Sequence, residues 1–158
     1  GPHDCRPSHL GEVLLDLYHQ RLPGLVAGGF DWVDVRDVAA GILAAADQAL
    51  AGSRYLLGGQ RATVAELAQL VAQVTGRRAP WLVAPMWLAR AMAPGAEWAA
   101  RLAGRRPLFT PESLYALRNH LEISSSRARQ ELGYAPRSLE TTVRDTFEWF
   151  REAGMLEP

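Results

Sequence analysis

Apolar residues along the chain recur mostly at the three- and four-residue spacing of amphipathic helices. The clearest case is residues 8–20, where Ser8 can cap the first free amides and Pro23-Gly24 can stop the helix. Five side chains of this segment fall on one helical face: Leu10, Val13, Leu14, Leu17 and Tyr18. The pattern therefore predicts a helix over residues 8–20 with one buried side.

A different period follows in residues 30–35, where bulky apolar and acidic residues alternate. A period of two predicts a strand. The strand runs directly into an apolar segment that predicts a helix reaching about Leu50, with Asp37 accepting hydrogen bonds from its first free amides. Residues 55–57 predict another short strand, ended by Gly58-Gly59.

Residues 63–66, Thr-Val-Ala-Glu, have the pattern of a capping box, in which the first and fourth side chains satisfy each other's backbone amides. They predict a helix that ends at Gly76. Its inward-facing residues are Leu67, Leu70, Val71 and Val74. A further helix is predicted from Pro85, interrupted at Pro94-Gly95 and resuming toward Leu102.

The last third of the chain predicts a helix start at residues 110–112 and a short strand at residues 121–123. Ser124 or Ser125 then opens a short helix that closes at Gly133. Ser138 starts the last helix, which Gly154 stops. Its inward-facing residues are Leu139, Val143, Phe147 and Phe150.

Short strands alternating with helices predict a helix-rich α/β or α+β fold. A complete doubly wound sheet needs more strands than this chain provides, so the predicted strands look like the far edge of a larger sheet. The length of 158 residues fits one domain or a piece of one, and the first residue is Gly rather than Met. We therefore expect a fragment of a larger fold.

The amino-acid composition excludes several classes of functional site. Seventeen basic residues balance seventeen acidic ones, which argues against a nucleic-acid-binding surface. All the basic residues are arginine, and the lack of lysine excludes a Walker A loop and a Tyr-x-x-x-Lys dehydrogenase pair within this chain. A single cysteine, Cys5, excludes an internal disulfide and fits a reducing compartment. With no signal peptide or membrane-spanning run visible, we expect a cytoplasmic protein without an integral membrane segment.

Three candidate sites have structural explanations that we favour. The glycines at 24, 28 and 29 precede a strand, whereas a phosphate-binding loop must follow one. The four histidines lack the spacing of a metal site, so no metal is expected. Asp31, Asp34 and Asp37 lie at intervals of three residues and could suggest an acid–base cluster. On a strand, however, residues three apart point to opposite faces. Asp37 also has the predicted role of a helix cap.

A group of Trp and Met residues surrounds the proline-interrupted helix: Trp81, Met86, Trp87, Met92 and Trp98. They can pack in a core, or they can form an adaptable apolar lid over a ligand. Both interpretations stay open from the sequence. Docking on a membrane surface through Trp87 and Trp98 is a further alternative.

Segments spread along nearly the whole chain resemble the extended short-chain dehydrogenase/reductases, in the order in which that family has them. They are the Gly-Pro-x-Asp of residues 1–4, Trp-Val-Asp-Val-Arg-Asp-Val-Ala at 32–39, Tyr-Leu-Leu-Gly-Gly at 55–59 with Thr63 and Glu66-Leu67, the Ser-Ser-Ser-Arg-Ala-Arg-Gln-Glu-Leu-Gly-Tyr-Ala-Pro of 124–136, and Trp149-Phe150. Residues 76–80 and 104–110 resemble the dihydroflavonol-4-reductase-like branch, which includes hopanoid-associated sugar epimerases.

The resemblance implies that the chain is the C-terminal portion of a Rossmann-type enzyme. Residues 1–60 would form the edge of the nucleotide-binding sheet interwoven with the substrate lobe, and residues 61–158 a mainly helical substrate-binding lobe. The dinucleotide loop and the Tyr-x-x-x-Lys would lie in an N-terminal half that this chain lacks. An uncovered hydrophobic flank is then expected where that half docks.

The same resemblance assigns roles to residues. It implies no catalytic residue in this chain, and contacts to NAD or NADP, bound mainly by the N-terminal half, from Pro2, Pro7 and Ser8. The substrate-binding candidates are His3, Arg6, His9, Met86, Trp87 and Arg90.

The implied function is substrate binding in an NAD(P)-dependent oxidoreductase that acts on a carbonyl or secondary alcohol. Sugar-nucleotide members usually have Arg before the position of Asp31, where this chain has Phe30, and residues 117–120 do not match their Arg-Pro-Gly-Asp segment. An apolar substrate is therefore favoured, and the isolated chain is expected to be inactive.

Two alternatives remain: a sugar-nucleotide epimerase or dehydratase of the same fold, and a stand-alone, non-catalytic binding module. The expected partner is a small-molecule substrate, with no nucleic acid. A homodimer is compatible with the family.

Overall fold

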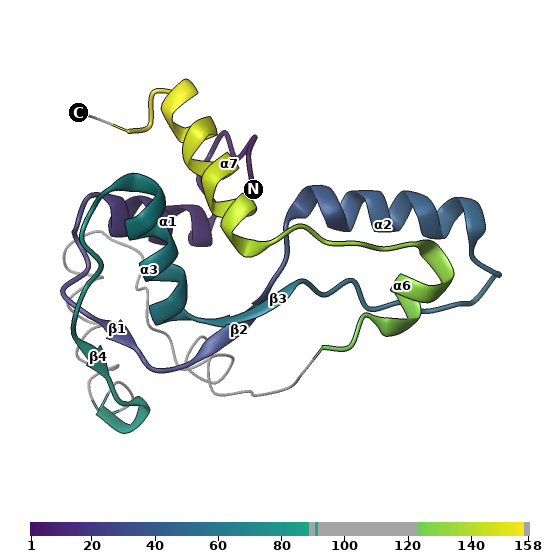
Figure 1. Cartoon of the computed structure of the whole chain (residues 1–158), viewed down its shortest axis with the longest axis horizontal. Helices are drawn as coiled ribbons and strands as arrows, with labels where there is room; N and C mark the ends of the chain where they lie inside the picture. Colours follow the sequence, from purple (N-terminus) through teal and green to yellow (C-terminus); the bar gives the residue numbers. More distant parts are fainter. Residues whose placement is uncertain (89–90, 92–122, 157–158) are drawn as a thin grey trace.

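The computed structural model describes residues 1–88, 91 and 123–156 (Figure 1). The elements are α1 (His9–Tyr18), β1 (Leu25–Val26), β2 (Gly29–Trp32), α2 (Val35–Gln48), β3 (Gln60–Thr63), α3 (Val64–Thr75), β4 (Val83–Ala84), α6 (Ser126–Leu132) and α7 (Leu139–Glu152). Residues 86–88 are also helical. The helix-rich α/β class predicted from the sequence is confirmed.

Two small sheets connect the helices. Strands β2 and β3 pair antiparallel, with Gly29 opposite Thr63 and Trp32 opposite Gln60. Strands β1 and β4 pair parallel over two residues each. The backbone approaches closely at Gly59, where a Cβ atom would lie 1.9 Å from the Trp32 carbonyl oxygen, so only glycine fits there.

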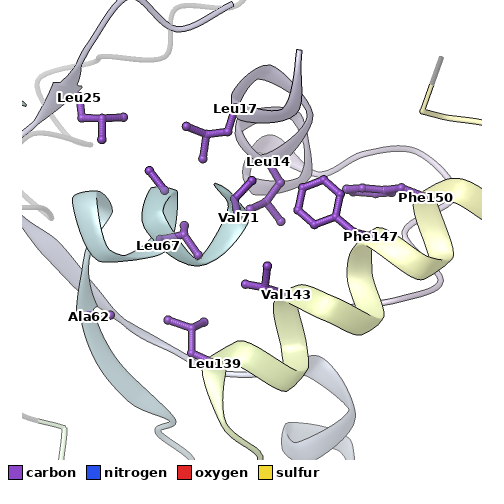
Figure 2. Packing of buried hydrophobic residues seen from close by; sticks show 11 residues of the cluster. Leu14, Leu17, Leu25, Ala62, Leu67, Val71, Leu139, Val143, Phe147 and Phe150 are labelled. Carbon is purple, nitrogen blue, oxygen red and sulfur yellow. The ribbon is translucent and has the colours of Figure 1, made fainter. Parts of the chain in front are cut away.

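The main core lies between α1, α3 and α7 (Figure 2). Leu14 and Leu17 come from α1, and Leu67 and Val71 from α3. From α7 come Leu139, Val143, Phe147 and Phe150, all buried as the sequence pattern predicted. Helices α1, α3 and α7 thus bury most of the apolar positions that their periodicity assigns to the interior. The exception is Leu10 of α1, which was predicted to face inward and is 44% exposed.

A smaller cluster lies beside α2, which extends away from the other long helices in Figure 1. Its buried members are Ala128, Leu132 and Tyr134. Tyr55 and Leu57 pack against them, together with two alanines of α2 and the alanine that follows its last residue. Helix α2 also approaches residue 57 closely, because a Cβ at Gly41 would lie 2.8 Å from a Leu57 methyl carbon.

Most helix ends follow the predicted capping chemistry. The Ser8 side chain accepts from the Gly11 N–H at 3.2 Å, and Ser138 does the same for Thr141. Thr63 and Glu66 form the predicted capping box. Glycines in the left-handed conformation close α3 at Gly76 and α6 at Gly133.

Three sequence predictions need correction around α2: the bounds of one strand, the residue that caps the helix, and a second strand. The strand predicted over residues 30–35 spans Gly29–Trp32, because Asp34 rather than Asp37 caps α2 and accepts from the Arg36 N–H at 2.9 Å. Residues 55–57 are not assigned to a strand, since no backbone ladder joins them to another part of the described chain. The predicted stop of the last helix is confirmed: α7 ends at Glu152 with Ala153 as its C-cap, and Gly154 follows in the left-handed conformation with φ of 68°.

The elements predicted between Arg90 and Glu122 lie outside the described residues. Ile123, the last residue of the strand predicted at 121–123, is described and is not in a strand.

Candidate functional site

The amino-terminal segment, residues 1–8, contains most of the predicted ligand-binding residues. Its course is fixed by Asp4, whose carboxylate accepts from the Ser8 N–H at 2.8 Å. A Cβ at Gly11 would lie 2.7 Å from the same carboxylate, so the turn packs tightly on the start of α1. The pair Asp4 and Ser8 therefore holds residues 4–8 against the N-terminus of this helix.

His3 adopts a backbone conformation that non-glycine residues rarely use, with φ of 70°. Its ring packs on Trp149 of α7, with 4.9 Å between ring centroids and 54° between planes. The Trp149 indole nitrogen is buried and has no hydrogen-bond partner within the described part of the chain. The tilted ring contact with Trp149 of α7 helps to hold His3 in this strained conformation.

The start of the segment rests on Asp34, the N-cap of α2. A Cβ added to Gly1 would lie 3.0 Å from Asp34 Oδ1. The Asp34 side chain is fully buried, so it has no free space into which it could move. A larger residue at position 1 would therefore displace either the segment or the carboxylate.

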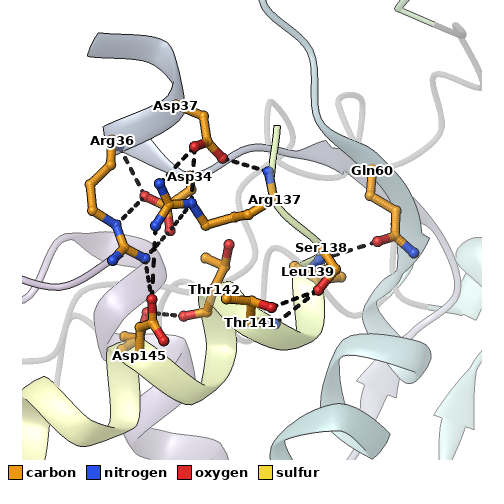
Figure 3. A network of polar contacts seen from close by, with 11 residues as sticks. Asp34, Arg36, Asp37, Gln60, Arg137, Ser138, Leu139, Thr141, Thr142 and Asp145 are labelled. Carbon is orange, nitrogen blue, oxygen red and sulfur yellow. Dashed lines mark hydrogen bonds and ion pairs between the residues drawn. The ribbon is translucent and has the colours of Figure 1, made fainter. Parts of the chain in front are cut away.

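Asp34 belongs to an ionic network that joins α2 to α7 (Figure 3). The Arg36 guanidinium binds the Asp34 carboxylate in a bidentate manner: Nε donates to Oδ1 at 2.9 Å and Nη2 donates to Oδ2 at 2.7 Å. The Nη2 group also donates to Asp145 of α7 at 2.7 Å. Arg137 donates from its backbone and side chain to Asp37. The network fixes where α7 starts relative to α2.

The network shifts the ionisation of its buried members. Burial by itself raises the pKa of Asp34, but hydrogen bonds from the Arg36 side chain and backbone, its positive charge and a bond from Thr142 outweigh it, so the pKa lies well below its usual range. The pKa of Arg36 is raised, chiefly by its hydrogen bond to Asp34. Both groups are therefore charged across the physiological range.

Sequence reasoning missed this network because it placed Asp34 on a strand. In the structure Asp34 and Asp37 are the N-cap and the first helical turn of α2, so their spacing of three brings them to the same end of the helix. Their partners in α7 are remote in sequence and carry no local signal. The prediction that these aspartates have structural roles is consistent with the contacts. The role of Asp37, however, is an ion pair with Arg137 and not the predicted helix cap.

Asp31 also has a structural contact. It accepts from the Gly59 N–H at 2.6 Å and so closes the end of the β2–β3 pair.

The other predicted site residues fall into two groups. Arg6 and His9 are exposed beside α1, and His9 Nδ1 lies 3.8 Å from Glu12 Oε2. Met86 is partly buried and Trp87 is 70% exposed, in the short helical segment that follows β4. Figure 1 places this segment well away from residues 1–9, so the described residues do not bring the two groups together. Arg90 lies outside the described residues.

A separate cavity of about 370 Å³ opens between α3 and α7. Charged side chains of α7 line it with Gln73 and Val74, and two of them, Glu140 and Arg144, already pair with each other at 2.6 Å. None of the predicted site residues lines this cavity.

The described residues contain no group of three or more His, Cys, Asp or Glu side chains placed to hold a metal ion. No helix formed by these residues has the length and apolar character needed to cross a membrane.

Comparison with known proteins gives a consistent picture over the whole length. The chain is 37% identical over 99% of its length to "Sterol demethylase protein B" of Methylococcus capsulatus and 30% identical to "Putative dihydroflavonol 4-reductase" of Synechocystis. It superimposes on the crystal structure of gox2253 with a TM-score of 0.80 and 34% identity, covering 99% of this chain and 48% of that one.

These similarities fit the C-terminal part of an extended short-chain dehydrogenase/reductase. The chain spans 48% and 47% of the two curated relatives, so about half of each has no counterpart here. PA4631, a nucleoside-diphosphate-sugar epimerase from Pseudomonas aeruginosa, shares the fold with a TM-score of 0.74 and 27% identity over 99% of this chain and 46% of that protein. No protein-family model matches the chain.

Proposed function

We propose that this chain is the substrate-binding part of an NAD(P)-dependent oxidoreductase that interconverts a carbonyl and a secondary alcohol. The similarity to the Methylococcus and Synechocystis proteins along 99% of the chain carries this proposal. The reacting acid/base group would come from the other half of the protein, since this chain has no lysine and hence no Tyr-x-x-x-Lys pair.

The segment of residues 1–8 suits the nicotinamide end of such a cofactor. Pro2 and Pro7 are partly buried and offer apolar surface, and the Ser8 hydroxyl accepts from the Gly11 N–H, which leaves its own hydrogen to donate. The described residues provide no glycine-rich loop for the phosphates, so these would be held by the other half. When bound, the nicotinamide would supply the hydride.

His3, Arg6 and His9 would then face the substrate from this chain, with Met86, Trp87 and Arg90 as further contacts. Their proposed role is to orient the substrate and exclude water from the reacting atoms. An apolar, polycyclic substrate is supported by the exposed Trp87 and by the name of the Methylococcus relative, which refers to a sterol.

The full-length protein should oxidise NADPH or NADH in the presence of a ring ketone, and the isolated 158-residue chain should not. Turnover is followed by the loss of nicotinamide absorbance, with boiled protein as the control. Activity of the isolated chain would contradict the assignment of the acid/base group to the other half of the protein. Absence of cofactor binding by the full-length protein would contradict the proposed reaction.

A sugar-nucleotide substrate is the second candidate, favoured by the similarity to the Pseudomonas epimerase. The position before Asp31 is Phe30, which cannot pair with a diphosphate as an arginine can. Titration of the full-length protein with a UDP-sugar separates the two candidates. Micromolar binding would favour the epimerase, whereas binding of the ring ketone alone would favour the apolar substrate.

A further inference from the structure

The segment that follows α3 combines large apolar side chains with positive charge. Residues 76–88 include two tryptophans and two arginines and have no Asp or Glu. Residues 20–28, which contain the paired strand β1, also have no Asp or Glu. Their only charged residue is Arg21, which lies 4.0 Å from Asp16 of α1. The positive charge of this end of the molecule therefore comes chiefly from the two arginines of residues 76–88.

Three consecutive side chains of this segment are apolar and uncovered. Trp81, Leu82 and Val83 are 89%, 48% and 43% exposed. We call these three residues the Trp81 patch. Figure 1 places β4, which begins at Val83, at the end of the molecule remote from α2. Single exposed apolar residues are normal on a protein surface, whereas a contiguous group of large ones indicates an interaction site.

Backbone pairing fixes the course of the chain through the Trp81 patch. The Leu82 carbonyl accepts from the Leu25 N–H at 2.8 Å, and the Ala84 carbonyl accepts from the Ala27 N–H at 3.0 Å. Leu25 is buried in the main core, and Ala79 packs against the same core. The patch therefore stands on backbone that is anchored to the core, so its binding to a partner requires little further ordering of the chain.

The two arginines lie beside the patch and are exposed. Arg78 is three residues before Trp81, so their Cα atoms are at most about 11 Å apart. The long arginine side chain can therefore reach a surface that the Trp81 ring contacts. Arg77 stacks on Tyr18 of α1, with its guanidinium carbon 4.7 Å from the ring centroid. Because the Tyr18 ring is uncharged, this contact leaves the positive charge of Arg77 without neutralisation.

The size and the chemistry of this surface favour a lipid bilayer over a protein as its partner. A stable protein interface buries about 800 Å² on each side, which is more than three neighbouring side chains provide. At a membrane, Trp prefers the boundary between headgroups and acyl chains, and arginines are attracted to anionic headgroups. These two contributions add, so a small apolar patch with adjacent positive charge is sufficient for binding at a membrane surface.

We propose that the Trp81 patch, together with Arg77 and Arg78, docks the protein on the surface of a membrane that contains anionic lipids. The patch enters the boundary between headgroups and acyl chains, and the two arginines contact lipid phosphates. This surface differs from the sequence-based alternative, which used Trp87 and Trp98. Trp98 lies outside the described residues, and Trp87 is a candidate substrate contact. The inference goes beyond the proposed function and does not depend on it.

Co-sedimentation of the full-length protein with vesicles, without cofactor or substrate, tests the proposal. Vesicles of phosphatidylcholine with about one third phosphatidylglycerol should bind the protein at least about tenfold more strongly than vesicles of phosphatidylcholine alone. Trp81→Ser should weaken this binding about tenfold or more, and Arg78→Gln about fivefold. The control is Arg129→Gln, which removes the same charge from an exposed position of α6 and should change binding by less than about twofold.

A second measurement needs no variant. Raising the salt concentration to about 0.5 M should release most of the unsubstituted protein from the anionic vesicles, because salt screens the attraction between arginines and headgroups. The variants are expected to fold, since their side chains are exposed, and each should keep Tm within about 1 °C of the unsubstituted protein.

Several outcomes would overturn the membrane-docking surface. They are no binding to the anionic vesicles, equal binding to both kinds of vesicle, unchanged binding of Trp81→Ser, and equal effects of Arg78→Gln and Arg129→Gln. Analytical ultracentrifugation without vesicles covers the remaining alternative. If the unsubstituted protein forms a dimer that Trp81→Ser dissociates, the patch belongs to an interface with a second copy and the proposal is wrong.

Discussion

Arg137 and Asp37 are 100 residues apart in sequence and are joined by three hydrogen bonds. The guanidinium donates to Oδ1 at 2.9 and 2.8 Å, and the Arg137 backbone N–H donates to Oδ2 at 2.9 Å. The Asp37 side chain is 9% exposed, and Arg137 supplies the counter-charge to this largely buried carboxylate. The pair fixes the chain that enters α7 to the first turn of α2.

Removing this partner should therefore be costly. Arg137→Ala leaves a buried carboxylate without its counter-charge, and we expect a loss of about 3 kcal/mol in the free energy of unfolding, measured by urea titration. Arg137→Lys keeps the charge but loses the fork geometry, so it should lose less. The control is Arg144→Ala, which breaks the exposed pair with Glu140 and should cost under about 0.5 kcal/mol. Equal losses for Arg137→Ala and Arg144→Ala would contradict this role.

The depressed pKa of Asp34 makes stability depend on pH in a defined direction. The folded-state pKa lies below the ordinary value of 3.8, so the carboxylate stabilises the fold fully above about pH 5. That contribution is lost progressively as the pH falls through 3.8 toward the lower folded value. In Asp34→Asn the fall in urea midpoint between pH 6 and pH 3 should be smaller than in the unsubstituted chain. Parallel pH profiles would show that Asp34 does not carry the effect.

The positive φ of His3 predicts an unusual order of stability among substitutions. His3→Ala loses the contact with Trp149 and keeps the backbone strain, whereas His3→Gly loses the contact and relieves the strain. We therefore expect His3→Gly to be more stable than His3→Ala by about 1 kcal/mol, measured as the difference in free energy of unfolding. His3→Ala equal to or above His3→Gly would mean that position 3 is not held at positive φ.

The close approach at Gly59 predicts a severe effect from one added methyl group. A Cβ there would lie 1.9 Å from the Trp32 carbonyl oxygen, a backbone atom that cannot move without breaking the β2–β3 pair. Gly59→Ala should cost more than about 3 kcal/mol in urea unfolding. Gly76→Ala is the matched control, since its Cβ meets nothing within 4 Å and only its left-handed φ of 70° is unfavourable, at about 1 kcal/mol. Similar losses at both positions would contradict the clash.

The helices were predictable because their signals are local. The capping box at Thr63 and Glu66 and the apolar spacing of Leu139, Val143 and Phe147 need only neighbouring residues to be recognised, and the structure confirms both. Strands depend on partners elsewhere. Residues 55–57 have a strand's alternation but no strand pairs with them in the described chain, so the sequence pattern alone gave the wrong assignment.

The candidate site was only partly accessible from sequence. The resemblance singled out residues 1–9, but not the contacts that hold them, because Trp149 and Asp34 are distant along the chain from His3 and Gly1. The ionic network was missed for the same reason. Arg36, Arg137 and Asp145 are ordinary surface residue types until the fold brings them together.

The two apolar clusters differ greatly in size. The one between α1, α3 and α7 has eleven buried residues, and the one beside α2 and α6 has three. Cooperative opening costs least where few apolar contacts must separate, so we expect the α2–α6 region to open at a lower free energy than the larger cluster. The ion pairs of Asp34 and Asp37 join α2 to residues of and next to α7, so we expect them to oppose the spread of such an opening to the larger cluster.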